Sequence, residues 1–277
     1  MRRSRRRGAK LQSATPCASR SVRHAVCVTQ NQARATLERM EEDGQLPDTI
    51  AVPFVRCRPQ EDAQVVLCRL GLGHPRPALF LSGGARKIAP EHRALATECL
   101  RGVAQAATRL GMALVSGGTN CGVMASLGEA CASLPQPPPL IGVLPSGIVA
   151  RRGAAILERH HSHFLFVEGG DWGVESGWLS RLAAALTKGQ HPCLGLLING
   201  GRIARRDLSA ALEQGLTVWA MEGSGRLADG LAQHRQGSAA PDPQLQALAA
   251  AANLSFLPAT LRARAMEQRI LKHFRRS

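Results

Sequence analysis

A glycine-rich turn between Ala113 and Ala130 has the residue types that bind phosphate. In the stretch ALVSGGTNCGVMASLGEA, a short apolar run is followed by Gly117, Gly118 and Gly122, and then by apolar residues near helical spacing. Glycines let the backbone turn sharply and approach a ligand closely. The helix that follows would direct unpaired N–H groups and the positive end of its dipole at the turn. The pattern predicts a phosphate cradle, although a plain connector between a strand and a helix explains this turn alone equally well.

Six short apolar runs from Ala78 onward alternate with stretches of helical periodicity. The runs cover residues 78–82, 112–116, 140–144, 163–167, 193–198 and 216–221. Leu95 and Cys99 begin one helical face between the runs, and Val174 and Trp178 begin another. Short buried strands separated by helices predict an α/β fold with a doubly wound, mainly parallel, Rossmann-like sheet and helices on both faces.

Small or glycine-rich residues follow each of these six runs. The six turns are SGGARK (82–87), SGGTNCG (116–122), PSG (145–147), EGGDWGVES (168–176), NGG (199–201) and EGSGR (222–226). Because the carboxyl ends of parallel strands meet at one edge of a sheet, these turns would line an open crevice with backbone donors. We therefore expect a nucleotide-sized ligand at this edge.

The expected domain organisation has four parts: a disordered basic tail (1–22), an appended α/β segment (23–76), the Rossmann-like domain (77–236) and a C-terminal helical extension (237–277). Within the appended segment, the pattern predicts strands at 25–29 and 50–55 and helices at 32–42 and 65–72. In the extension it predicts helices at 245–254 and 259–274. The last helix is amphipathic and basic, so it packs on the domain or a second subunit, or contacts a membrane surface or an acidic partner.

The net charge of +15 is concentrated at the two ends of the chain. Residues 1–24 carry eight Lys/Arg and no acid, and residues 262–277 carry six Lys/Arg and one acid, which leaves +2 for the rest. Such ends attract anionic partners weakly and non-specifically, so we do not expect specific nucleic-acid binding. The alternative, an RNA- or DNA-binding protein, predicts salt-dependent binding that requires residues 1–24.

The composition is typical of a cytoplasmic protein without a membrane span. The eight cysteines form no CxxC pair and fit reduced core positions. The uncharged stretch 130–150 contains five prolines, which exclude a transmembrane helix. The acid-free N-terminus resembles an organellar transit peptide, but a basic tail explains it as well. The histidine cluster of His160, His161 and His163 has no acidic or cysteine partner at recognisable spacing, so we expect no metal.

Five segments, in order, resemble the SLOG domain of melastatin-type TRP channels and its stand-alone prokaryotic, LSDAT-type relatives. They are VSGGTNCGVMASLGEA, LIGVLPSG, HHSHFLFVEGGDWGVESGWLSRL, LGLLINGG and VWAMEGSGRLADGLA, and the resemblance spans roughly residues 78–233. It implies a Rossmann-like fold that binds and senses an ADP-ribose- or NAD-like nucleotide without requiring a further cofactor. It also implies signalling to a partner effector protein or a second copy in a homo-oligomer.

The resemblance assigns ligand-binding roles to several turns. It implies that Gly117, Gly118, Thr119 and Gly122 hold phosphate, that Gly169, Gly170 and Glu175 border the ligand, and that Gly223, Ser224, Gly225 and Arg226 close the site. Ser82, Gly83, Gly84 and Asn120 complete the expected set. The chemistry agrees, because hydroxyl groups and a forked guanidinium donate to phosphate.

The same superfamily contains the Lonely-guy phosphoribohydrolases, related to lysine-decarboxylase-like proteins, which cleave the N-glycosidic bond of nucleoside monophosphates. Their pattern PGGxGTxxE corresponds here to EGGDWGVES, with Glu168 in place of proline and Glu175 two residues after the last glycine instead of four. The alternative function is therefore an N-glycosidase acting on nucleoside monophosphates or NAD-like nucleotides. Its catalytic acids would be Glu175, Glu168 and Asp171, stabilising an oxocarbenium-like transition state or activating water. Equally, Glu175 would favour the first turn of a helix and Asp171 would serve the turn.

Two tryptophans near these acids have different expected positions. Trp178 shares a helical face with Val174 and Leu182, so we expect it in the core. Trp172 lies inside the loop and is a candidate for stacking on a base or ribose.

Overall fold

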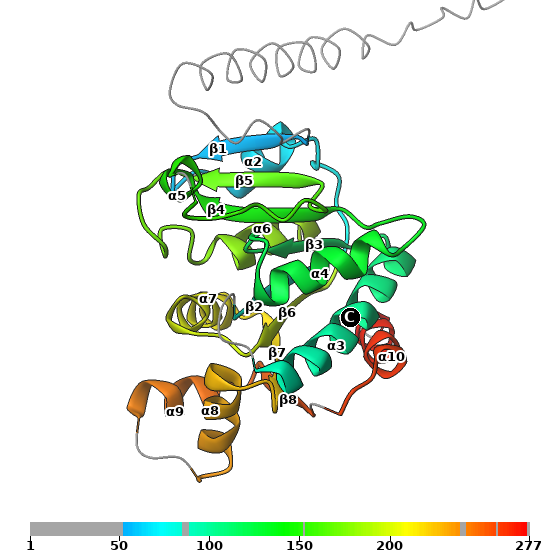
Figure 1. Ribbon diagram of the computed structural model, residues 1–277, viewed down its shortest axis with the longest axis vertical. Helices are drawn as coiled ribbons and strands as arrows, with labels where there is room; N and C mark the ends of the chain where they lie inside the picture. Colours follow the sequence, from blue (N-terminus) through cyan, green and yellow to red (C-terminus); the bar gives the residue numbers. More distant parts are fainter. Residues whose placement is uncertain (1–51, 85–88, 152, 239–241, 259, 276–277) are drawn as a thin grey trace, which may run out of the picture. The chain divides into compact units, whose positions relative to one another are not determined.

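The structure is a computed structural model that describes residues 52–84, 89–151, 153–238, 242–258 and 260–275 (Figure 1). The expected basic tail, the strand at 25–29 and the helix at 32–42 lie outside these residues, as do residues 85–87 of the first glycine turn.

One parallel sheet forms the centre of the described chain, with the strand order β1-β5-β4-β3-β2-β6-β7-β8. The strands are β1 (Phe54–Cys57), β2 (Ala78–Gly83), β3 (Ala113–Ser116), β4 (Leu140–Pro145), β5 (His163–Val167), β6 (Cys193–Ile198), β7 (Thr217–Glu222) and β8 (Leu254–Pro258). Every neighbouring pair of these strands is parallel. This topology confirms the predicted doubly wound sheet, and all six predicted strands are present within a residue or two of their expected ends.

Helices cover both faces of the sheet. They are α2 (Ala63–Arg69), α3 (Pro90–Leu110), α4 (Gly122–Ala132), α5 (Ser146–Ala150), α6 (Trp178–Thr187), α7 (Arg202–Glu213), α8 (Arg226–Arg235), α9 (Pro243–Ala250) and α10 (Ala263–Phe274). Buried residues of α2, α6, α7, α8 and α9 share one hydrophobic core with one face of the sheet, and those of α3, α4 and α10 share a second core with the other face. Because the central strands are buried on both faces, their sequences are continuous apolar runs.

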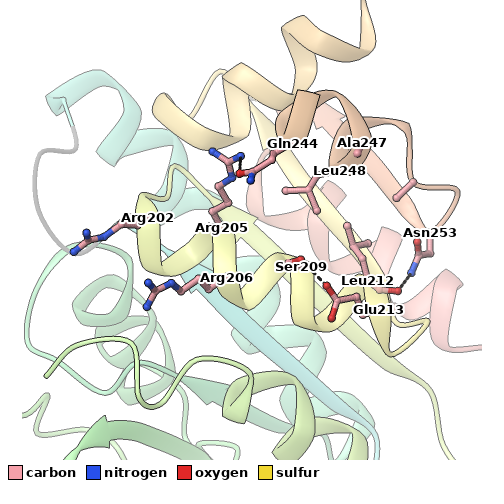
Figure 2. Close-up of a pocket in the computed structure, with 11 residues that line it drawn as sticks. Arg202, Arg205, Arg206, Ser209, Leu212, Glu213, Gln244, Ala247, Leu248 and Asn253 are labelled. Atoms are coloured by element: carbon pink, nitrogen blue, oxygen red, sulfur yellow. Dashed lines mark hydrogen bonds between the residues drawn. The ribbon is translucent and has the colours of Figure 1, made fainter. Parts of the chain in front are cut away.

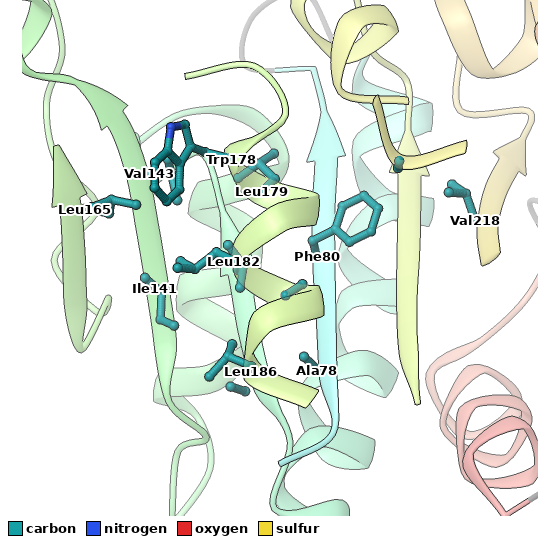
Figure 3. Packing of buried hydrophobic residues seen from close by; sticks show 14 of the residues in the cluster. Ala78, Phe80, Ile141, Val143, Leu165, Trp178, Leu179, Leu182, Leu186 and Val218 are labelled. Atoms are coloured by element: carbon teal, nitrogen blue, oxygen red, sulfur yellow. The ribbon is translucent and has the colours of Figure 1, made fainter. Parts of the chain in front are cut away.

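The α6 core shows how the predicted helical face packs. Trp178, Leu182 and Leu186 lie against strand residues that include Ile141 and Val143 (Figure 3). Trp178 is 1% exposed, as expected for a core residue. The helix begins at Trp178 and not at Val174, because Gly177 before it has a φ of 84°, which is not helical.

Some elements differ from the sequence-based expectation. β1 pairs with β5, so the described end of the segment expected as an appended layer is an edge strand of the same sheet. β8 lies at the other edge and was not predicted, because its five residues LSFLP end in a proline, which only an edge strand tolerates.

α10 covers α3 with Met266 and Ile270, and Arg109 pairs with Glu267 at 2.9 Å. No helix in the described ranges has the length and apolarity needed to cross a bilayer.

Gly195 of β6 leaves the space that the Phe80 ring of β2 fills. A Cβ at position 195 would overlap this ring. We expect Gly195→Ala to lower the free energy of unfolding by about 1–3 kcal/mol through overpacking. Phe80→Leu in the same chain should recover part of this loss. Urea denaturation of the single and double variants measures both effects.

Gly230→Ala is the matched control for that prediction. Gly230 lies inside α8, where an added Cβ would lie 4.0 Å from the nearest side-chain atom, so the new methyl group meets open space. This variant should be neutral or slightly stabilising. Strictly additive losses from Gly195→Ala and Phe80→Leu would contradict the packing explanation.

Candidate functional site

The position of the candidate site follows from the strand order. β2 and β6 are neighbours, with Gly83 opposite Ile198, but the chain leaves β2 for α3 on one face and leaves β6 for α7 on the other. The topological switch point of the sheet, where open α/β sheets bind their ligands, therefore lies beyond the carboxyl ends of these two strands. Gly84 and Asn199 lie at this point, directly after β2 and β6.

Helices that begin near this edge have no side-chain caps, and backbone carbonyls satisfy some of their first-turn N–H groups. The Gly84 carbonyl accepts from Val123 of α4, and the Asn199 carbonyl accepts from Ala228 of α8. Within the described residues, α3, α4, α6, α7 and α8 follow Ala89, Cys121, Gly177, Gly201 and Gly225, none of which donates or accepts a capping hydrogen bond through a side chain. By contrast, Asp62 caps α2 and Asp242 caps α9. Uncapped helix N-termini leave N–H donors and partial positive charge at the edge, which favours an anionic ligand.

The turn after β3, which the sequence predicts as a phosphate cradle, uses several of its donors within the chain. The Asn120 amide donates to the Ile156 carbonyl at 2.7 Å, and the Gly118 carbonyl accepts from the Glu158 amide at 2.9 Å. Gly118 has a φ of 66°, and a Cβ there would lie 2.8 Å from the Gly142 Cα. The Thr119 hydroxyl is buried beside the Cys121 thiol at 3.2 Å. The phosphate role of this turn stays a prediction.

A buried hydrogen-bond network lies beneath that turn. The Ser116 hydroxyl is 2.8 Å from His161 Nε2, and His161 Nδ1 is 2.8 Å from a Glu158 carboxylate oxygen. The other oxygen of Glu158 is 2.7 Å from His160 Nδ1. The expectation that the histidine cluster lacks an acidic partner was therefore wrong, because the segment folds back so that Glu158 lies between two of the histidines.

Burial and hydrogen bonding act in opposite directions on Glu158. Burial alone would raise the pKa of Glu158, but its hydrogen bond with His161 and the charges of His161 and His160 hold this pKa below the ordinary value. Its carboxylate also fills the space beside Gly128 of α4, where any Cβ would overlap it. We define residues 156–161 as the strap, because this network fixes them onto the turn after β3.

The three acids of the loop after β5 lie in different environments. Glu168 and Asp171 are exposed, and Asp171 is 3.8 Å from the Arg151 guanidinium. Glu175 is buried and accepts a hydrogen bond from the Gly173 amide at 2.6 Å. Burial raises the pKa of Glu175, although backbone amides and Arg206 offset part of that rise.

The remaining predicted residues of this loop differ in their contacts and exposure. The Gly169 carbonyl accepts from the Gly147 amide at 2.9 Å, which joins the turns after β4 and β5, and Gly170 beside it is exposed. Trp172 is 42% exposed, so its ring is available for stacking.

Asp207 is a buried carboxyl group that sequence analysis missed. The Ser82 hydroxyl at the end of β2 donates to Asp207 Oδ2 at 2.8 Å. Burial raises the pKa of Asp207 to about 7, with the Glu175 charge adding to the rise and the Ser82 and Gly177 hydrogen bonds opposing it. The signal was in the helical periodicity, because Asp207 lies three residues after Ala204 and next to Leu208 on the buried face of α7.

The turns after β6 and β7 hold each other. The Asn199 amide donates to the Ser224 hydroxyl at 2.7 Å, and the Asn199 Nδ2 donates to the Ser224 carbonyl at 2.8 Å. The predicted ligand residue Ser224 is fully buried, and its hydroxyl donates to the Met221 carbonyl. Gly223 donates its amide to Asp229. Arg226 is exposed at the start of α8.

A groove of about 750 Å³ runs between α7 and α9 (Figure 2). Its lining includes Arg202, Arg205, Arg206, Ser209, Leu212, Glu213, Gln244, Ala247, Leu248, Ala251 and Asn253. Arg205 hydrogen-bonds to Gln244, whereas Arg202 and Arg206 extend away from α9 (Figure 2). Arg206 reaches the loop after β5, because a Cβ on Gly173 would lie 2.5 Å from its guanidinium. Two arginines of α7 thus add positive charge near the start of this helix, and Arg206 does so beside the loop after β5.

Comparisons with known proteins place this geometry in context. A family model described as SLOG in TRPM, prokaryote, matches residues 76–266. The chain is 26% identical over 223 residues to transient receptor potential cation channel subfamily M member-like 2 of Nematostella vectensis, a match that covers 64% of this chain and only 14% of that protein. The X-ray structure of TM1055, a structural genomics target, is 18% identical, with a TM-score of 0.47, covering 70% of this chain and 98% of that chain.

Proposed function

The chain belongs to the family described as SLOG in TRPM, prokaryote, and on that premise we propose that it binds an ADP-ribose- or NAD-like nucleotide and senses it. The ligand occupies the crevice at the carboxyl edge of the sheet and requires no further cofactor. Ligand occupancy is passed to a partner effector protein or to a second copy of the chain, in the cytoplasm. The observation that carries this proposal is the group of helix N-termini without side-chain caps that follow the neighbouring strands β2, β6 and β7.

The charges and surfaces around the crevice support a nucleotide. Arg202, Arg206 and Arg226 are exposed near the start of α7 and α8, where guanidinium groups and helix N-termini together favour phosphate. Trp172 offers an exposed aromatic face for a base. An ADP-ribose-like ligand combines these features, because it carries two phosphates, ribose hydroxyls and an aromatic base.

An N-glycosidase is the second candidate function, and Glu175 is the observation that favours it. This residue is 6% exposed, has a carboxyl pKa raised by burial and lies near the Arg206 guanidinium. A carboxyl group tuned in this way can serve as a general acid or base during cleavage of a glycosidic bond. Glu168 and Asp171 are exposed to solvent, so Glu175 would carry the reaction.

Nucleotide binding should be visible as a rise in thermal stability. With ADP-ribose or NAD at about a hundredfold excess over Kd, the Tm should rise by about 5–10 °C. The double variant Arg202→Gln/Arg206→Gln should reduce this rise, whereas Arg264→Gln, an exposed arginine on α10, should leave it unchanged. Adenosine, which lacks phosphate, should give little shift. If neither ADP-ribose nor NAD raises the Tm, the proposal is contradicted.

Product analysis separates the two candidate functions. The protein is incubated with AMP, NAD and ADP-ribose, and chromatography detects any released base. The glycosidase would be established if the protein releases base, the Glu175→Gln variant does not, and the Glu168→Gln variant still does. Tight binding with intact ligand would eliminate it and leave the sensor.

A further inference from the structure

The groove between α7 and α9 has an apolar surface at its base. Leu212 of α7, Leu248 of α9 and Ala251, which follows α9, all line the groove (Figure 2). These three residues pack against the hydrophobic core that α7 and α9 share with the sheet, yet each stays partly exposed. We call them the floor of the groove. Because the groove has a volume of about 750 Å³, side chains of a docked molecule can enter it and bury apolar surface on the floor.

Hydrogen bonds join the two sides of the groove at both of its ends. At one end, Arg205 of α7 donates to the Gln244 side chain of α9 and lies 3.5 Å from Asp242. At the other end, the Asn253 side chain donates to the Leu212 carbonyl at 3.2 Å. These contacts fix the two helices relative to each other and leave the space between them open. A groove that is formed before binding loses little conformational entropy when a partner docks.

Positive charge lies at the end of the groove where α7 begins. Arg202 and Arg206 are exposed at this end, and their side chains extend away from α9 (Figure 2). Arg202 makes no hydrogen bond or ion pair with any residue that the structure describes. At the far end of α7, the exposed carboxylate of Glu213 accepts a hydrogen bond from the Ser209 hydroxyl at 2.8 Å. The groove therefore offers unpaired cationic charge at one end, the apolar floor, and an acid at the other end.

We propose that this groove docks an amphipathic helix of a partner protein, with acidic side chains over Arg202 and Arg206 and apolar side chains on the floor. The lining residues of α7 run from Arg202 to Glu213, a helix length of about 16 Å, which matches about three turns of a partner helix. Apolar side chains at i, i+4 and i+7 of that helix would face the floor. This inference rests on the proposed function in one respect, because it gives the docking surface and the chemistry of the partner effector.

The chemistry of the groove favours this occupant over others. A small anion or a nucleic-acid backbone would pair with the arginines but would leave the apolar floor uncovered. A purely apolar segment would cover the floor but would leave the exposed guanidinium groups without a partner. The same groove of a second copy cannot fill the space, because two hollows that face each other stay empty.

Fluorescence anisotropy of the full chain with a labelled synthetic peptide tests the proposal. The probe is a helical peptide of about 14 residues, with leucines at i, i+4 and i+7 and glutamates in its first two turns. It should bind at least about tenfold more tightly than an analogue in which lysines replace the glutamates. This preference should decrease as the salt concentration rises, because the arginines are exposed. Equal affinity of the two peptides, or binding of neither, would overturn the proposal.

Two variants of α9 test where the peptide binds. Ala247 is exposed and lines the groove, so Ala247→Glu adds a carboxylate beside the floor and should weaken the acidic peptide about tenfold. Ala250→Glu is the matched control, because Ala250 is exposed on the same helix but is not among the lining residues. It should bind the peptide normally. Circular dichroism checks that both variants are folded, and equal affinities of the two variants would contradict the location.

The oligomeric state tests the alternative occupant, a second copy of the chain. If the unmodified protein sediments as a dimer that Ala247→Glu dissociates, the groove is an interface between copies and the partner helix is ruled out. A sedimentation pattern that is the same for the unmodified protein and for Ala247→Glu supports the partner helix.

Thermal shifts with ADP-ribose separate this inference from the proposed function. The shift should be the same in Ala247→Glu as in the unmodified protein, because Ala247 is not among the residues expected to bind the nucleotide. If nucleotides bind and the acidic peptide does not, the docking proposal fails alone. If the acidic peptide binds and no nucleotide does, the proposed function fails and the docking surface stands.

Discussion

Replacing Glu158 by glutamine is expected to lower the free energy of unfolding by about 3–5 kcal/mol. The carboxylate of Glu158 is buried and hydrogen-bonds to His161 at 2.8 Å and to His160 at 2.7 Å. The neutral amide would leave the buried imidazole of His161 without its charged partner and would also disturb the hydrogen bond between His161 and Ser116. Urea or guanidinium denaturation at pH 7 measures the change.

Glu129→Gln is the matched control for Glu158→Gln. Glu129 is exposed on α4, so its substitution should change the free energy of unfolding by less than about 0.5 kcal/mol. Because the folded pKa of Glu158 lies below its unfolded value, its contribution is present above the ordinary pKa of 4.5 and is lost as the pH falls through the folded pKa. A loss of under about 1 kcal/mol in Glu158→Gln would show that the strap is held by other contacts.

Asp207→Asn is expected to remove a fall in stability that the protein shows between about pH 4 and pH 7. Burial raises the folded pKa of Asp207 from 3.8 to about 7. The contribution of the protonated group is complete below pH 3.8 and is lost as the pH rises through about 7, because the unfolded chain ionises first. From a shift of this size, the stability lost across the window is about 4 kcal/mol. The Ser82 hydroxyl can still donate to the amide oxygen of asparagine.

Denaturation curves collected from pH 4 to pH 7 give the free energy of unfolding at each pH. The effect of Asp207→Asn is the difference between its slope of this free energy against pH and that of the unmodified protein. Asp242→Asn is the control, because Asp242 is only partly buried and the hydrogen bond from the Leu245 amide, with smaller contributions, lowers its pKa. The stability that Asp242 contributes is lost only below about pH 4, which lies outside this pH window. Asparagine is also a good helix cap. Identical slopes for Asp207→Asn and the unmodified protein would refute the assignment.

These two residues also show how buried carboxyl groups hold the ends of strands β2 and β3. Asp207 joins α7 to the end of β2, where the switch point lies. Glu158 lies against Gly128 of α4 and holds His161, whose Nε2 is 2.8 Å from the Ser116 hydroxyl at the end of β3. Both carboxyl groups lie below the predicted ligand turns and not in them. We infer that they position these turns, and that the exposed arginines of α7 and α8 contact the ligand.

Much of the fold could be predicted from local sequence. Runs such as Cys193–Ile198 are continuous and apolar because a central parallel strand is buried on both faces. The face of α6 was visible because its buried residues recur at helical spacing. The turns were visible because glycine marks positions such as Gly118, where the backbone has a positive φ and another strand lies in contact. β8 was missed because a short edge strand that ends in proline lacks this periodic signal.

The glycine turns as a group, the alternation of strands and helices, and the parallel sheet were determined by the sequence itself, because each depends on local periodicity and backbone freedom. Only the tertiary structure decided which turns are neighbours. The strand order places β2 beside β6 and brings Ser82 to Asp207, 125 residues away, and Ser116 to His161, 45 residues away. It also brings Arg226 to Gly201. Such contacts depend on how the sheet is ordered and the helices packed, and no local pattern of residues encodes them.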